Sequence, residues 1–336
     1  MFAHSHIRFA LLLLLVWSCA LPAEVPATAA AEDAAAVPTE GTSHSSTLPA
    51  YRSTVSEVRV AFFATTENHR PVENLTQADF AVVDDERVVR SFRSFAHSGE
   101  APLDVVALVD LSQSAAPRFR VAMNEVVQLV VREQSVPDDH ISVISFGGMR
   151  PALLCASDCG GAGAVARLLA VKSGGTTPLF DALRSGADFL LHHGRAGARP
   201  VLILFSDGND TISLHSAREA LEAVLDTGAP IYSVDMATSV NGTSSGESPG
   251  SMFLRQVSEA TGGLYFSPSS WQRISRQDGA AAVLNAVLDD LRASYVVTYA
   301  LPSHGAGFHS LRLLPTHNLN LTFRSRNGYF YEPNGP

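Results

Sequence analysis

The chain has 336 residues, of which 46% are hydrophobic and 17% are charged, and its formal net charge is −9. This composition excludes a largely disordered chain, because disorder requires few apolar residues and a high net charge. The acidic balance argues against a nucleic-acid partner, since phosphate backbones attract basic proteins. After the N-terminal segment, no apolar run approaches the roughly 20 residues that cross a bilayer. We therefore expect a folded protein with no transmembrane helix in its mature part.

The N-terminal segment has the pattern of an export signal. Residues 1–23 contain one basic residue, then a nine-residue apolar run, then small residues, which is typical of a secretory signal peptide. Cleavage after Ala20 and cleavage after Ala23 both fit, and Cys19 leaves lipid attachment as an alternative. Residues 24–52 are rich in Ala, Pro, Ser and Thr and are expected to form a linker. We expect a periplasmic, cell-surface or secreted protein.

Strand-like patterns fill residues 53–99, which we interpret as an N-terminal β segment. The candidate strands are 58–63, 80–83 and 88–92. The short acidic connection between the last two predicts a hairpin, with Asp84 and Asp85 in a solvated turn.

Strands and helices alternate over residues 100–293. The continuous apolar run 103–109 predicts a strand that is buried on both faces, as in a parallel sheet. Further strands are expected over 141–146, 152–154, 201–205, 231–236 and 264–266, and helices over 117–134, 178–192, 214–226, 252–261 and 284–291. This alternation predicts an α/β fold with a doubly wound, mostly parallel sheet that helices cover on both faces.

The chain returns to strand patterns over residues 294–336, the C-terminal β segment. The candidates are 294–300, 308–314, 319–323 and 329–331. We expect these strands to pair with those of 53–99. The two flanking segments would then form a β-rich accessory domain, with the α/β unit as an insertion between them.

If the protein is exported, its cysteines enter an oxidising compartment, which favours disulfide bonds. The mature chain would keep Cys155 and Cys159, which lie four residues apart. In an oxidising compartment a local disulfide is favoured, and two free thiols are the alternative. Without a histidine nearby, the pair does not form a tetrahedral zinc site.

Oxygen-rich loops border three of the predicted elements. Asp110, Ser112 and Ser114 follow the strand 103–109, the segment 174–177 precedes the helix 178–192, and Asp207 follows the strand 201–205. Because ligands of open α/β sheets bind at the carboxyl ends of the strands, we expect these loops to converge. Hard divalent cations take oxygen ligands, and Mg²⁺ takes six. Two carboxylates and three hydroxyls leave room for water or for the carboxylate of a partner.

The order of these motifs resembles that of a von Willebrand factor type A (VWA) domain. The motifs are Asp-x-Ser-x-Ser at 110–114, Gly-Gly-Thr at 174–176 and Ser-Asp-Gly at 206–208. The wider layout, over roughly 55–333, is similar to a secreted VWA-related family described from acidobacterial genomes. The resemblance implies a metal-ion-dependent adhesion site that holds one divalent cation, Mg²⁺ or else Mn²⁺ or Ca²⁺. The implied metal ligands are Asp110, Ser112, Ser114, Thr177 and Asp207, with Thr176 as the alternative to Thr177.

Two functional hypotheses follow from this resemblance. The first is a secreted, metal-dependent interaction module of the adhesion type, which docks an acidic residue of a protein partner. The alternative is a noncatalytic scaffold component of an envelope complex, in which the metal site is purely structural. The sequence contains no Gly-x-x-x-x-Gly-Lys phosphate loop, and we identify no nucleophile–base pair in it, so we do not expect an enzyme.

Overall fold

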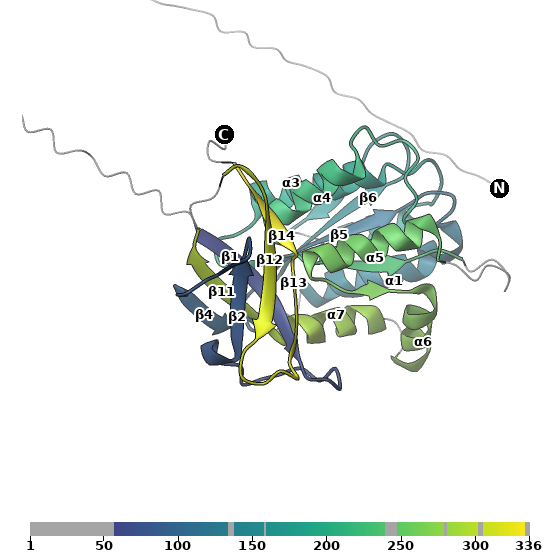
Figure 1. Ribbon diagram of the computed structural model, residues 1–336. Helices are drawn as coiled ribbons and strands as arrows, with labels where there is room; N and C mark the ends of the chain where they lie inside the picture. Colours follow the sequence, from purple (N-terminus) through teal and green to yellow (C-terminus); the bar gives the residue numbers. More distant parts are fainter. Residues whose placement is uncertain are drawn as a thin grey trace, which may run out of the picture. The chain divides into compact units, whose positions relative to one another are not determined.

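The computed structural model describes residues 57–133, 138–157, 159–238, 247–278, 281–301 and 305–332 (Figure 1). The expected signal peptide and linker lie outside these residues and stay predictions, as do the boundaries of the expected domains. Within the described ranges, we find no helix that combines the length and the apolar character needed to span a membrane.

A six-stranded sheet forms the centre of the α/β part. Its strand order is β10-β9-β8-β5-β6-β7, and all neighbours are parallel except β7, which runs antiparallel to β6. The strands are β5 (Leu103–Asp110), β6 (His140–Phe146), β7 (Ala152–Ala156), β8 (Arg199–Ser206), β9 (Ile231–Asp235) and β10 (Tyr265–Phe266). Every residue of β5 is buried, which confirms the strand predicted from its continuous apolar run.

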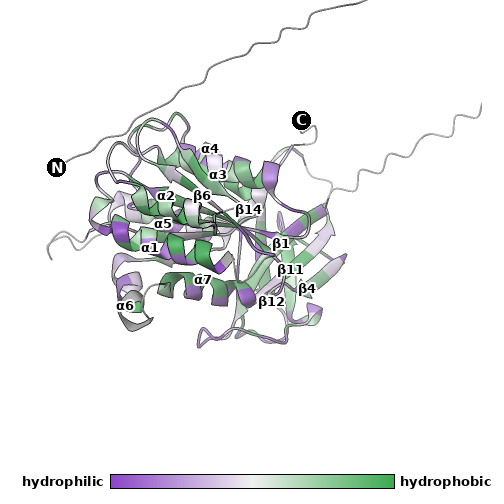
Figure 2. Ribbon diagram, turned by 180° about the vertical axis from the view of Figure 1, so that it is seen from behind, coloured by the Kyte–Doolittle hydropathy of each residue, from purple (hydrophilic) through white to green (hydrophobic). Residues whose placement is uncertain are grey.

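Helices cover both faces of this sheet, as predicted for a doubly wound fold (Figure 1). The helices are α1 (Ala116–Glu133), α2 (Ala162–Ala170), α3 (Leu179–His193), α4 (Ala217–Thr227), α5 (Pro249–Thr261), α6 (Pro268–Asp278) and α7 (Ala282–Arg292). One apolar core contains buried residues of α1, α2, α6 and α7, and the other contains residues of α3, α4 and α5. In Figure 2, α1 and α7 carry both hydrophobic and hydrophilic stretches, as is typical of helices that bury one side.

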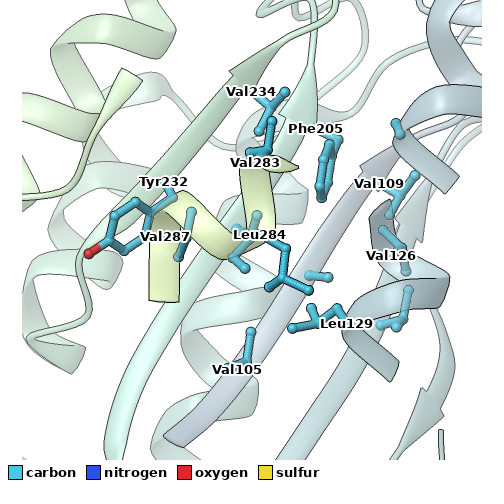
Figure 3. Close-up of a cluster of buried hydrophobic side chains, with 14 of the residues drawn as sticks. Val105, Val109, Val126, Leu129, Phe205, Tyr232, Val234, Val283, Leu284 and Val287 are labelled. Atoms are coloured by element: carbon cyan, nitrogen blue, oxygen red, sulfur yellow. The ribbon is translucent and has the colours of Figure 1, made fainter. Parts of the chain in front are cut away.

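Alternate side chains of β5 enter opposite cores. Val105 and Val109 belong to the core of α1 and α7, where Figure 3 shows Val109 next to Val126. Val106 and Leu108, whose side chains point to the other face of the strand, belong to the core of α3, α4 and α5. The period of two along a strand therefore divides one apolar run between two helical layers.

Three helix predictions need correction. Helices α2 and α6 were not expected from the sequence, and α4 begins at Ala217 instead of residue 214. The start of α4 is set by a capping box, in which Ser216 accepts a hydrogen bond from the Glu219 backbone and Glu219 bonds the Ser216 backbone.

The two flanking segments build two further four-stranded sheets. One has the order β13-β1-β11-β4 and the other β14-β12-β2-β3. Their strands are β1 (Glu57–Thr65), β2 (Phe80–Asp84), β3 (Arg87–Val88), β4 (Ser94–His97), β11 (Ser294–Ala300), β12 (Gly307–Pro315), β13 (Thr322–Ser325) and β14 (Gly328–Tyr331), with a short 3-10 helix, η1 (Gln77–Asp79), before β2. Antiparallel pairing of β1 with β11 and of β2 with β12 joins the two ends of the chain, as expected.

A shared core packs these two sheets together as a sandwich. Phe62 of β1, Phe80 of β2 and Tyr295 of β11 are buried in it, with ring centroids of Phe62 4.9 Å from Phe80 and 5.7 Å from Tyr295. The predicted strand 88–92 is wrong, because β3 ends at Val88 and the next strand, β4, pairs with β11 in the other sheet. The hairpin between β2 and β3 is confirmed.

The cysteine pair forms a disulfide. Cys155, in β7, is bonded to Cys159, and both residues are buried in the core of α1 and α7. Of the two alternatives left open by the sequence, the structure has the bridge.

Candidate functional site

Two buried carboxyl groups lie at the carboxyl edge of the central sheet. Asp110 is the last residue of β5, and Asp207 follows β8, the parallel neighbour of β5. Their exposed fractions are 0% and 3%. The sequence prediction that these strand ends meet therefore holds for the carboxylate-bearing loops.

The loop between β5 and α1 turns its hydroxyls toward one another. The backbone N–H of Ser112 donates to Oδ1 of Asp110 at 2.8 Å, and the hydroxyl oxygens of Ser112 and Ser114 are 3.1 Å apart. Two oxygens at right angles around Mg²⁺, each about 2.1 Å from it, would be about 3.0 Å apart. The two hydroxyls are thus within hydrogen-bond distance of each other, a separation that two neighbouring oxygen ligands of one Mg²⁺ would also have.

Ser206, the last residue of β8, was missed as a site residue. Its hydroxyl donates to Oδ2 of Asp110 at 2.7 Å and accepts from the backbone N–H of Gly208 at 3.1 Å. With Ser112 on the other oxygen, both oxygens of Asp110 are held in place. The signal was its place directly before Asp207, but only the strand pairing shows that it reaches Asp110.

The two threonines before α3 have different environments. Thr176 is exposed, and its hydroxyl donates to the backbone oxygen of Gly148 at 2.7 Å. Thr177 is buried, and its backbone N–H donates to the hydroxyl of Thr211 at 2.8 Å, while its carbonyl accepts from the Thr211 N–H at 2.9 Å. The loop after β8 therefore fixes the backbone of Thr177.

Backbone contacts join the remaining loops. The N–H of Gln113 donates to the carbonyl of Gly175 at 3.4 Å, and the N–H of Gly174 donates to the carbonyl of Leu111. Together with the Asp110–Ser206 and Thr177–Thr211 contacts, these bonds bring all three predicted loops to one edge of the sheet.

The N-terminus of α3 is capped from the loop after β8, which the sequence did not indicate. Oδ1 of Asp210 accepts from the N–H of Leu179 at 2.9 Å, and the hydroxyl of Ser213 accepts from the N–H of Phe180 at 3.0 Å. These side chains satisfy backbone donors that the helix leaves open at its first turn. They also hold the loop of Asp207 against the start of α3.

A tight backbone contact places Asp207 beside α5. Gly208 has φ +79°, and a Cβ there would lie 2.1 Å from the carbonyl oxygen of Gly250. Glycine is required at this position for two reasons. A positive φ is unfavourable for any residue with a Cβ, and an added Cβ would collide with the Gly250 carbonyl oxygen.

The site is rich in negative charge that the described protein does not neutralise. Burial, together with the nearby charge of Asp207, raises the pKa of Asp110 to about 6, although hydrogen bonds from Ser112 and Ser206 oppose the rise. Among the described residues, no Lys, Arg or His forms an ion pair with Asp110 or Asp207. Two buried carboxyls with hydroxyls around them, and only oxygen donors, fit a hard divalent cation.

A second acidic group lies in the sandwich, and the expectation of a solvated turn there was wrong for Asp84. Candidate ligand atoms of Asp84, Asp85 and His309 lie within 4.8 Å of one another. Asp84 is fully buried, and its Oδ2 accepts from the hydroxyls of Tyr299 at 2.8 Å and Tyr329 at 2.9 Å. Nδ1 of His309 is 2.6 Å from Oδ2 of Asp85, so this group forms a hydrogen-bond network across β2, β11, β12 and β14.

The family described as von Willebrand factor type A domain matches residues 104–277, just over half of the chain. No curated protein sequence matches. Similar solved structures include an aerotolerance-related membrane protein from Bacteroides fragilis, which is 12% identical, with 56% of this chain and 98% of that chain covered and a TM-score of 0.40. The pilus adhesin SpaC from Lactobacillus rhamnosus GG is 13% identical, with 69% and 34% covered and a TM-score of 0.44. BatB from Bacteroides thetaiotaomicron is 17% identical, with 54% and 98% covered and a TM-score of 0.38.

Proposed function

Because the chain belongs to the von Willebrand factor type A domain family, we propose that it is a metal-dependent interaction module. Domains of this family are generally interaction modules and not enzymes, so a protein partner is the coarser conclusion. The finer proposal is that one divalent cation, bound at the carboxyl edge of the sheet, docks a carboxylate of that partner. The narrower similarity to the secreted acidobacterial family stays a prediction.

The observation that carries this proposal is the pair of buried carboxyls, Asp110 and Asp207, without a cationic partner among the described residues. Asp110, Ser112 and Ser114 would hold the cation from the loop after β5, and Asp207 would hold it from the loop after β8. Thr177 is the better fifth ligand, since the hydroxyl of Thr176 is already bonded to Gly148. The bound cation would supply a positive charge with an open position for an anionic oxygen.

Export of the protein is part of the same proposal. The Cys155–Cys159 disulfide supports it, because disulfides persist in oxidising compartments outside the cytosol. The apolar run and small residues of 1–23 support it independently. We propose a periplasmic, cell-surface or secreted location.

The direct test is calorimetric titration of the chelator-stripped protein, from residue 24 onward, with Mg²⁺ and Mn²⁺. We expect saturable binding at one site, lost in Asp110→Ala and in Ser112→Ala. Asp289→Ala is the matched control, since this exposed carboxylate on α7 pairs with Arg292 and should leave binding unchanged. Absence of binding to the unaltered protein would contradict the proposal.

A structural role for the site is the second candidate. The observation in its favour is that both oxygens of Asp110 already bond Ser112 and Ser206, which ties the two loops together. If Mg²⁺ binds and raises the melting temperature but acidic peptides bind equally well with and without metal, the site stabilises loops only. Metal-dependent binding of a carboxylate-bearing partner would instead favour the docking role.

A further inference from the structure

A pocket of about 270 Å³ lies at the opposite end of the central sheet from Asp207. The outer face of β1 forms one wall, with Arg59, Ala61 and Phe63, while the alternate residues of β1 enter the sandwich core. The start of β8, the end of α4 and the junction of α7 with β11 form the other walls. Since β8 has eight residues at about 3.3 Å each, the pocket lies roughly 23 Å from the metal-site loops.

A buried arginine, Arg199, lines this pocket. It is the first residue of β8 and is 7% exposed. Its Nη1 donates to the carbonyl of Leu291 at 2.8 Å and to the hydroxyl of Ser294. Its Nε is buried and has no hydrogen-bond partner among the described residues. A guanidinium group that lines the pocket and is mostly removed from water is therefore not fully hydrogen-bonded.

Two more arginines line the same pocket. Arg326 donates from Nη1 to the carbonyl of Leu225 at 2.9 Å and from Nη2 to the carbonyl of Arg59 at 3.1 Å, and its Nε is also buried without a partner in the described structure. The third is Arg59 itself. All these acceptors are neutral oxygens, and none of the three arginines forms an ion pair with a described residue.

The two acidic residues of the lining do not cancel this charge. Glu57, at the rim, forms an ion pair with Arg93, which lies outside the pocket. Asp226 lies near Arg326, but no ion pair joins it to a described arginine, and burial raises the pKa of its carboxyl. Burial lowers the pKa of both Arg199 and Arg326. Holding several positive charges close together and away from water is unfavourable unless an anion binds beside them.

We propose that this pocket binds a small organic anion, whose carboxylate or phosphate group meets the guanidinium of Arg199. Guanidinium groups bind both kinds of oxyanion through paired, charge-assisted hydrogen bonds. The apolar part of the ligand would lie against Phe63, Val296 and Leu291, which also line the pocket. The volume is near the lower end of the roughly 300–1,000 Å³ of small-molecule sites, so the ligand is small.

The test uses calorimetric titration of the whole mature protein with three probes of similar size. Hexanoate carries a carboxylate, phenyl phosphate carries a phosphate, and hexanamide is a neutral match for hexanoate. We expect one of the two anions to bind saturably at one site, with a dissociation constant below about 1 mM, and hexanamide not to bind. The anion that binds identifies the head group.

Variants then locate the site. Arg199→Lys should weaken binding at least about tenfold, because it removes the forked donor set. Since Arg199 also bonds Leu291 and Ser294, Ala61→Phe provides an independent test that fills the pocket without touching an arginine. Arg312→Ala, an exposed charge on β12, is the matched control and should leave binding unchanged.

Three results would overturn the proposal. The first is that neither hexanoate nor phenyl phosphate binds. Equal binding of hexanamide would show that the pocket recognises apolar surface and not charge. Unchanged affinity in Ala61→Phe would place the anion elsewhere. Because Asp110 is remote from this pocket, Asp110→Ala should bind the anion normally, so this result is separable from that of the metal titration.

Discussion

Replacing Asp110 by Asn should stabilise the metal-free protein while it removes metal binding. Burial raises the pKa of this carboxyl from its usual 3.8 to about 6. A raised pKa in the folded state means that stability is present below pH 3.8 and is lost as the pH rises toward 6. The difference of about two pH units corresponds to about 3 kcal/mol lost by pH 8. Asparagine carries no charge and can still accept from the Ser112 N–H, so it should recover about 1–3 kcal/mol.

The assay is urea unfolding of chelator-stripped wild-type protein and Asp110→Asn at about pH 4.5, 6 and 8, which lie below, at and above the raised pKa. We expect the free energy of unfolding of the variant to rise relative to that of the wild type as the pH rises, with the largest difference at about pH 8. Asp289→Asn, an exposed carboxyl, should show no such trend. A difference that stays constant with pH, or a variant that is less stable at pH 8, would refute the reasoning.

Two further predictions concern other parts of the fold. Burial raises the pKa of Glu125, whose carboxylate accepts from the Leu284 N–H at the start of α7, so wild-type stability should fall as the pH rises above 4.5. Glu125→Gln should show less of this fall when urea unfolding is measured from about pH 4 to about pH 8, and parallel curves would contradict the prediction. Gly208→Ala should cost more than about 2 kcal/mol in the same assay and weaken Mg²⁺ binding, because it adds a clash with Gly250 to the cost of positive φ. In the control Gly228→Ala, at φ +67°, the added Cβ would make only an ordinary contact, 3.7 Å from Nη1 of Arg326, so the substitution should cost only about 1 kcal/mol, and equal losses would show that the clash is absent.

Local patterns were sufficient for several of the regular elements. The apolar run of β5 and the helical spacing of α7 are properties of consecutive residues, so both were predicted close to their observed bounds. The strand β11 (Ser294–Ala300) matches its predicted range at both ends.

The missed helices show where local patterns fail. Helix α6 is mostly polar, and one of its anchors is the buried Trp271, whose Nε1 donates to the carbonyl of Asp235 at 2.8 Å. Helix α2 is short, and Leu168 is buried against the core of α1 and α7. Both helices are stabilised by contacts with distant segments, which a window of neighbouring residues does not contain.

The sequence indicated the proposed metal ligands but not the residues that hold them in place. Asp110, Ser112 and Asp207 stand next to strand ends, so the sequence could locate them once the strands were known. Ser206 and Thr211 bond groups that lie far away in the chain, and neither contact leaves a pattern in the sequence.

The sequence by itself determined the alternation of strands and helices, the order of the oxygen-rich loops and the acidic charge, because each depends on residue identity and short-range spacing. Only the tertiary structure decided which strands pair, which threonine hydroxyl is already bonded, and that Arg59, Arg199 and Arg326 share one pocket. Those features arise where segments far apart in the chain meet. Their free energy comes from burial and hydrogen bonds that exist only after the chain has folded.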